Sequence, residues 1–165
     1  MKALKYSVDK IDRKILVALQ ADARLRNVEL AEQIGLSASP CLRRVRRLKD
    51  LGVIREFTTL VDPEAVGLPV SVFIQVTLER QIEHSLESFE AQIVHWPEVM
   101  ECYLMTGDSD YLLRVVAADL TAYQEFLMNK LTRVEGVASI KSSFALKRVV
   151  YRTALPVDRM EHVGN

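Results

Sequence analysis

The spacing of the apolar residues changes once along this chain of 165 residues, and that change limits the folds open to it. Before residue 62 the apolar side chains recur every three or four positions, as on one face of an α-helix. From residue 70 they alternate in VSVFIQVTLE, as on a half-buried β-strand. The stretch between them, DPEAVGLP, contains two prolines and a glycine and is typical of a linker. We therefore expect a helical domain at 1–61, a linker at 62–69 and a second domain at 70–165.

The charge divides in the same way. Residues 1–60 contain 13 Lys and Arg against 7 Asp and Glu, a net +6, and the remainder contains 9 against 15, a net −6. Opposite charges indicate different partners, and the basic half is the candidate for nucleic acid. No apolar run approaches the roughly 20 residues of a membrane span, so we expect a cytoplasmic protein without a membrane partner. Cys41 and Cys102 form no C-x-x-C pair, and we expect buried, reduced thiols and no metal site.

Two helices are expected first in the basic half. Apolar residues at helical spacing predict one helix over residues 8–21, with Ser7 as its candidate N-cap. A second helix of about two turns begins with Asn27 as N-cap and stops at Gly35, the residue type best suited to a left-handed C-cap.

A third helix follows a short turn and ends before Gly52. Its N-cap is Ser39, with Pro40 as the first helical residue, or alternatively Ser37. A short second helix, a glycine turn and a basic third helix together predict a helix-turn-helix. The β-prone residues 54–61 would add a short strand or wing.

The third helix has two different faces. At 100° per residue Cys41, Val45 and Leu48 share the inner side, and the polar residues project outward, where a recognition helix meets the major groove. Residues near the N-terminal end would reach base edges, and arginines a turn later would contact phosphate. A solvated basic face is the alternative. The residues assigned to DNA are Ser39, Pro40, Arg43, Arg44, Arg46 and Arg47, with Arg44 toward the flank.

The second domain is predicted as an α+β fold. Strand-like and helix-like segments follow one another as β-α-β, then β-α-β, then one more strand; they cover residues 70–79, 86–96, 99–105, 111–117, 119–133, 137–145 and 148–155. This order is that of a ferredoxin-like βαββαβ sandwich, an antiparallel sheet with two helices on one face. The other face would be left uncovered, so we expect a second copy to bury it and form a homodimer.

Four motifs resemble one known family. They are DKIDRKIL at 9–16, NVELAEQIGLS at 27–37, SPCLRRVRRL at 39–48 and TGDSDYLLRV at 106–115. In this order and spacing they resemble the Lrp/AsnC family of leucine-responsive and asparagine regulators, over nearly the whole chain. The resemblance implies a DNA-binding winged helix-turn-helix, a dimerising sheet domain that assembles further into tetramers or octamers, and an amino acid as effector in place of any cofactor.

The polar loop between two apolar strands is the candidate effector site. Gly, Asp and Ser are ordinary turn formers, so a plain turn is the alternative. The resemblance implies that this loop helps to form the ligand pocket, where a carboxylate would accept from an α-ammonium group and backbone N–H groups would hold an α-carboxylate. The residues assigned to the effector are Gly107, Asp108, Ser109 and Asp110, with Ser142 and Ser143 from a later strand.

These features bear on three classes of function. A regulator that binds a pseudo-palindromic operator on double-stranded DNA uses both halves of the chain. An enzyme would need a converged set of acid, base or nucleophile, and no G-x-S-x-G, phosphate-binding glycine loop or metal cluster is found in the sequence. A stand-alone amino-acid sensor would leave the basic helix unexplained. We therefore expect a transcriptional regulator and no enzyme.

Overall fold

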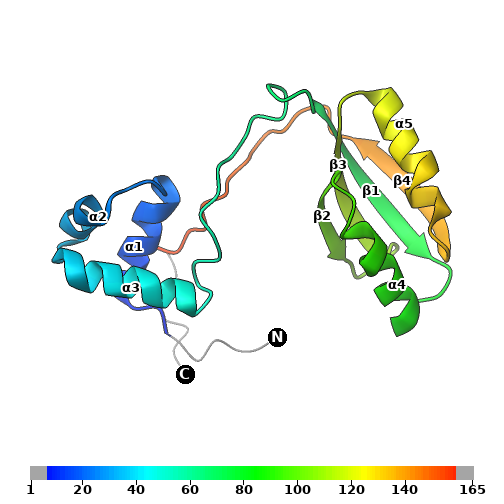
Figure 1. Cartoon of the computed structure of the whole chain (residues 1–165). Coiled ribbons are helices and arrows are strands. Elements are labelled where there is room, and N and C mark those ends of the chain that lie inside the picture. The colour runs from blue at the N-terminus through cyan, green and yellow to red at the C-terminus, as the bar shows by residue number, and fades with distance from the viewer. Residues whose placement is uncertain (1–6, 159–165) are drawn as a thin grey trace. The chain divides into compact units, whose positions relative to one another are not determined.

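The computed structural model describes residues 7–158, which belong to two compact units (Figure 1). One unit contains the chain up to Leu60 together with the segment that begins at Val150, and the other runs from Val61 to Val149. The chain therefore passes from the first unit to the second and returns. Within the described part, no helix has the length and apolar character needed to cross a membrane.

The first unit contains the three expected helices: α1 (Lys10–Ala21), α2 (Asn27–Ile34) and α3 (Ala38–Asp50). The N-cap of α1 is Asp9, not Ser7. The Oδ1 atom of Asp9 accepts from the backbone N–H groups of Ile11 and Asp12 at 2.8 Å each. The Asp12 carboxylate accepts in return from the Asp9 N–H, so that the two aspartates form a capping box.

The turn between α2 and α3 depends on Asn27 and Gly35. Asn27 is the first residue of α2 and not its cap, and its side-chain amide donates to the Ala38 carbonyl at 2.8 Å. Gly35 ends α2 at φ 75°, in the left-handed region that glycine adopts at low cost. The N-cap position of α3 is Ser37, the alternative to Ser39.

Apolar side chains from all three helices form the core of this unit. Ile15, Leu30, Cys41 and Leu48 are buried together, as the spacing predicted. Residues 54–61 form no strand, so the expected wing is not a β-strand here. The sheet among the described residues has four strands, all in the second unit, and an extended segment outside it has no ladder to join.

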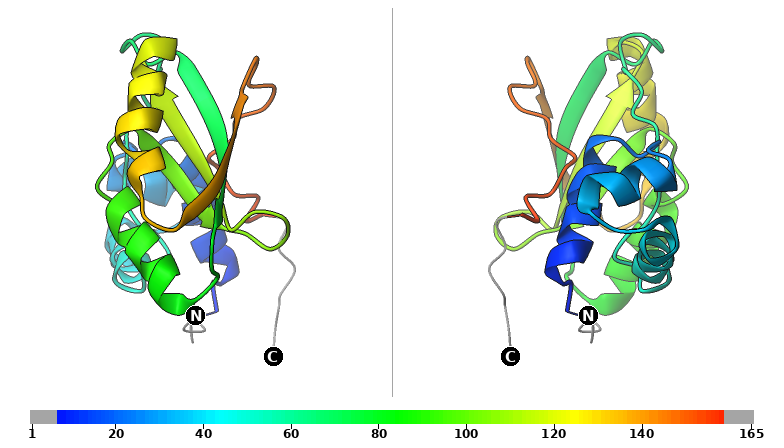
Figure 2. Two further views of the ribbon diagram at one scale, coloured as in Figure 1. Left: turned by 90° about the vertical axis from the view of Figure 1, so that its right-hand side faces the viewer. Right: turned by 90° about the vertical axis from the view of Figure 1, so that its left-hand side faces the viewer.

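The second unit is a four-stranded sheet with two helices. The strands are β1 (Val70–Leu78), β2 (Val99–Leu104), β3 (Tyr111–Ala117) and β4 (Val137–Phe144), in the order β2-β3-β1-β4 with every pair antiparallel. Both helices, α4 (Glu83–Ile93) and α5 (Leu120–Asn129), lie on one face (Figure 2). This confirms the predicted α+β, ferredoxin-like fold.

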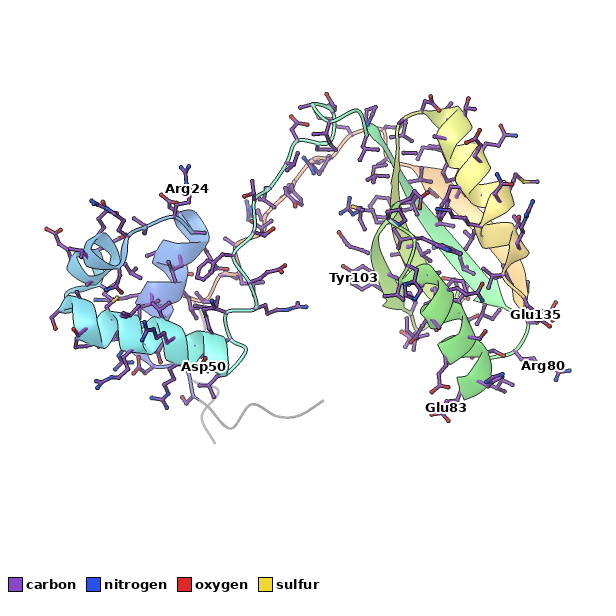
Figure 3. The ribbon with its side chains drawn as sticks, in the orientation of Figure 1. Arg24, Asp50, Arg80, Glu83, Tyr103 and Glu135 are labelled. Atoms are coloured by element: carbon purple, nitrogen blue, oxygen red, sulfur yellow. The ribbon has the colours of Figure 1, made fainter. Side chains whose placement is uncertain are left out.

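Alternation decides what each face of the sheet presents. Val72, Ile74 and Val76 point toward the helices and are buried in the core with Phe89. Their neighbours on β1 point to the other face, which no helix of this unit covers, and there Phe73 is exposed. Tyr103 of β2, labelled in Figure 3, is also exposed.

Three expectations for this part of the chain were wrong. The helix that Asp119 caps ends at Asn129 and is followed by a short 3₁₀ turn, Leu131–Arg133. Residues 148–155 form no strand. The pairing with β1 ends at the bond from Ala145 N–H to the Ser71 carbonyl, so these residues have no strand beside them to pair with. Cys102 is exposed, whereas Cys41 is buried as expected.

Candidate nucleic-acid interface and effector site

The outer face of α3 presents a cluster of cations to solvent. Arg43, Arg46 and Arg47 are exposed, as is Ser39 near the start of the helix, while Pro40 is half-buried. Proline is tolerated there because the first turn of a helix leaves its N–H groups unpaired in any case. The structure therefore brings five of the six predicted DNA-binding residues onto or beside one accessible face.

Arg44 is different from its neighbours. Its Nη1 atom lies 2.7 Å from Asp9 Oδ2 and 2.8 Å from Asp12 Oδ1, so the guanidinium bridges α3 to the start of α1. Burial by itself raises the pKa of Asp9, but hydrogen bonds from the Asp12 N–H and from Arg44 outweigh it and hold that pKa below its usual range. The sequence indicated neither contact, although Asp9 and Asp12 stand three apart on one helical face.

A cavity of about 230 Å³ lies on the sheet face that the helices leave open. β1 and β4 supply its floor, since Gln75 pairs with Lys141 and Thr77 pairs with Ser139. The loop that follows β2 supplies the wall. Its lining residues are Gln75, Thr77, Met105, Thr106, Asp108, Ser109, Ser139 and Lys141. The lining thus combines one cationic and one anionic side chain with several hydroxyl groups.

The predicted loop contributes to this cavity through only two of its residues. Asp108 and Ser109 line it, whereas Gly107 and Asp110 do not. Gly107 supplies the turn, because its φ of 126° is one that residues with a side chain rarely adopt. The hairpin then closes with a bond of 2.8 Å from Met105 N–H to the Asp110 carbonyl.

Asp110 is buried and bonded within the domain. One carboxylate oxygen accepts from the Leu78 N–H at 2.7 Å, and the other accepts from the Gln81 side chain at 2.5 Å. Its own N–H donates to the Val76 carbonyl at 2.9 Å. These bonds attach the loop to the end of β1, so Asp110 shapes the cavity without lining it.

The two predicted serines lie on opposite faces of β4. Ser142 pairs with Ile74 on the helix side and forms a hydrogen bond with the Tyr123 hydroxyl. Ser143 pairs with Phe73 on the open face, outside the cavity. Ser139 and Lys141 line the cavity in place of Ser142 and Ser143. Alternation in SIKSS implied that Ser142 and Ser143 face opposite sides of the sheet, because neighbouring strand residues cannot share a face.

A second and larger cavity, of about 480 Å³, lies between α4 and the edge strand β2. It is lined mainly by apolar side chains, including Ile93 and Leu104, and its polar groups include Glu90 and Tyr111. These two bond to each other at 2.8 Å. We assign no function to this cavity.

Comparisons with known proteins match both parts of the chain. Residues 8–55 match the family model described as winged helix-turn-helix DNA-binding, and residues 71–155 match the Lrp/AsnC ligand binding domain. The Bkd operon transcriptional regulator of Pseudomonas aeruginosa is 51% identical over 150 residues, which cover 91% of this chain and 98% of that protein. The leucine-responsive regulatory protein of Rhizobium meliloti is 41% identical over 146 residues, covering 88% and 94%.

A solved structure is similar over almost the same length. The crystal structure of a transcriptional regulator from Neisseria meningitidis in complex with L-Met superposes with a TM-score of 0.87 at 42% identity. The match covers 92% of this chain and 98% of that one.

Proposed function

The chain belongs to the Lrp/AsnC family of DNA-binding transcriptional regulators, and we propose that it reads DNA with α3 and responds to an amino acid held in the cavity beside Asp108. The observation that carries this proposal is the pairing of two sites in one chain. One is an exposed cationic face on the second helix of a helix-turn-helix, and the other is a polar cavity with both charges. The family consists of regulators and not of enzymes.

The DNA contacts divide by position along α3. Ser39 and Arg43 lie near the N-terminal end, where side chains reach base edges, and an arginine there can donate two bonds to guanine. Arg46 and Arg47 follow about one turn later and contact phosphate, which fixes register without reading sequence. We assign DNA binding to residues 1–61 and effector binding and assembly to residues 70–165.

Two arginine variants test this division. Arg43→Ala should relax preference at one base position at a cost of roughly 1 to 3 kcal/mol, because a bidentate base contact is lost. Arg46→Ala should weaken binding to all duplexes alike and lower the salt slope of binding by about one, since one phosphate contact is lost. Binding curves on selected and unrelated duplexes at several salt concentrations measure both effects. Identical behaviour of the two variants would contradict this placement of α3.

The cavity suits a zwitterionic amino acid. Lys141 offers an ammonium group to an α-carboxylate, Asp108 offers a carboxylate to an α-ammonium group, and Met105 provides an apolar surface for a side chain. The relative from Neisseria meningitidis forms a complex with L-Met, so L-methionine and L-leucine are the first ligands to test. Calorimetric titration should show that the wild type binds the ligand and that Lys141→Met binds it with an affinity at least tenfold lower. Equal affinities would remove Lys141 from the site.

A second copy of the chain is the proposed cover for the open sheet face. Phe73 and Tyr103 are exposed on it, and burial of such side chains favours association. A two-fold dimer would present two copies of α3 to a pseudo-palindromic operator, and dimers would assemble further into tetramers or octamers in the cytoplasm. Sedimentation of the wild type and Phe73→Glu measures this. A wild-type monomer at micromolar concentration would contradict it.

A further inference from the structure

Arg44 is an arginine of α3 that is partly buried and bonded within the domain. Arg43, Arg46 and Arg47 are exposed, but the side chain of Arg44 is only 29% exposed and its Nη1 atom contacts two carboxylates. Two carboxylates thus stand beside this one cation. A phosphate would be repelled by that arrangement, so Arg44 is poorly suited to contact the DNA backbone.

The partners of Arg44 are themselves fixed. Asp12 is fully buried among the residues that α1 contributes to the core. Asp9 caps α1, and the carboxylate oxygen that it does not use for the cap is the one that Arg44 contacts. A charge-assisted bond is directional, whereas apolar contacts such as those of Cys41 and Leu48 tolerate some sliding and rotation. The polar contacts therefore add a directional restraint on the rotation of α3 about its axis.

A small rotation of α3 displaces the ends of its side chains by more than a hydrogen bond to a base edge tolerates. Side chains end roughly 5 to 6 Å from a helix axis, so a rotation of about 20° moves them by roughly 2 Å. Hydrogen bonds to a base edge tolerate only a few tenths of an ångström around about 3 Å. Arg43 is adjacent to Arg44 in the chain, and its aim follows this rotation.

We propose that Arg44, Asp9 and Asp12 form a positioning network that fixes the rotation of α3 and thereby its sequence discrimination, without contact between Arg44 and DNA. The proposal rests on the assignment of base reading to the N-terminal part of α3. Arg44 is a positioning residue, and its removal should affect discrimination more than non-specific affinity.

The salt dependence of binding distinguishes positioning from phosphate contact. A duplex is first selected from a random pool with the wild type, and affinities for it and for an unrelated duplex are measured at several salt concentrations. Arg44→Met should lower the ratio of the two affinities at least tenfold and leave the salt slope on the unrelated duplex unchanged. The matched control Arg46→Met should lower that slope by about one and keep the ratio. A slope lowered by about one in Arg44→Met with an unchanged ratio would overturn the proposal.

A second variant covers the case in which Arg44→Met does not fold because Asp12 has lost its bond to the guanidinium. The double variant Asp12→Leu, Arg44→Met replaces the ion pair by apolar groups, an exchange that other folds tolerate. It should unfold cooperatively and bind the unrelated duplex with the salt slope of the wild type. Its ratio of affinities for the selected and the unrelated duplex should be at least tenfold lower than that of the wild type. Wild-type selectivity in this double variant would overturn only the positioning network. A wild-type protein that selects no sequence at all would overturn the proposed DNA reading as well.

Discussion

Asp110 shows how one residue can serve a site that it does not line. Its carboxylate accepts from the N–H of Leu78, the last residue of β1, and from Gln81 just beyond it, while Asp108 two residues earlier faces the cavity. A buried backbone N–H that loses its acceptor keeps the full cost of its desolvation. The two aspartates of one loop therefore have different duties.

Substitution of each aspartate separates these duties. Asp110→Ala should lower the free energy of unfolding by about 1 to 3 kcal/mol, because Leu78 N–H and Gln81 lose their acceptor. Asp108→Ala should leave stability within about 0.5 kcal/mol, since the side chain is exposed. Urea unfolding measures stability, and titration with L-methionine measures binding. Full stability of Asp110→Ala would contradict the role given to this carboxylate.

At the scale of single elements, the first turn of α1 depends on an ionised side chain. Asp9 caps the helix and pairs with Arg44, and its pKa lies below the usual range. A carboxyl group with a depressed pKa in the folded state stabilises the fold above its unfolded pKa, about 4, and that stabilisation is lost as the pH falls through the lower folded value. The first unit should therefore weaken in acid.

Asp9→Asn isolates the charge from the cap, because asparagine is an equally good N-cap residue. At pH 7 the variant should be less stable by less than about 1 kcal/mol, since about half of the Asp9 side chain is exposed and the pair is screened by solvent. The difference from the wild type should shrink as the pH falls below about 4. Urea unfolding at pH 7 and pH 3, followed by circular dichroism, measures it. A difference that grows in acid would contradict the assigned sign.

At the scale of the whole molecule, the first unit contains two stretches of chain far apart in sequence. The side-chain amide of Gln20 at the end of α1 accepts from the Leu155 N–H at 2.7 Å and donates to the Leu155 carbonyl at 3.1 Å. This pair of bonds imitates one rung of a β-ladder. The segment predicted as a strand thus has a partner, but the partner is a side chain of α1 and not a neighbouring strand.

Gln20→Ala should release this segment without unfolding the domain. The bond is exposed, so the free energy of unfolding should change by less than about 0.5 kcal/mol. Hydrogen exchange at the Leu155 N–H should become several-fold faster, because the amide loses its acceptor. Gln20→Glu is the matched control, since it keeps an acceptor for that N–H. Equal exchange in the wild type and Gln20→Ala would show that the contact does not order the segment.

The sequence alone determined the kinds of element and their order. Helical spacing before residue 62 and alternation after residue 70 predicted three helices and then a ferredoxin-like sheet, and four motifs pointed to the family. These signals are local, since a period or a C-cap glycine involves residues within a few positions of one another. The basic outer face of α3 was predictable for the same reason.

Only the tertiary structure decided which contacts individual polar residues make. Arg44 turns inward because Asp9 and Asp12 lie 35 and 32 positions away in the chain and yet beside it in the fold. Lys141, and not Ser142, lines the cavity because the register of β4 against β1 decides which residues face it. Such pairings depend on contacts between distant segments, and the energies that select them arise only once the core has packed.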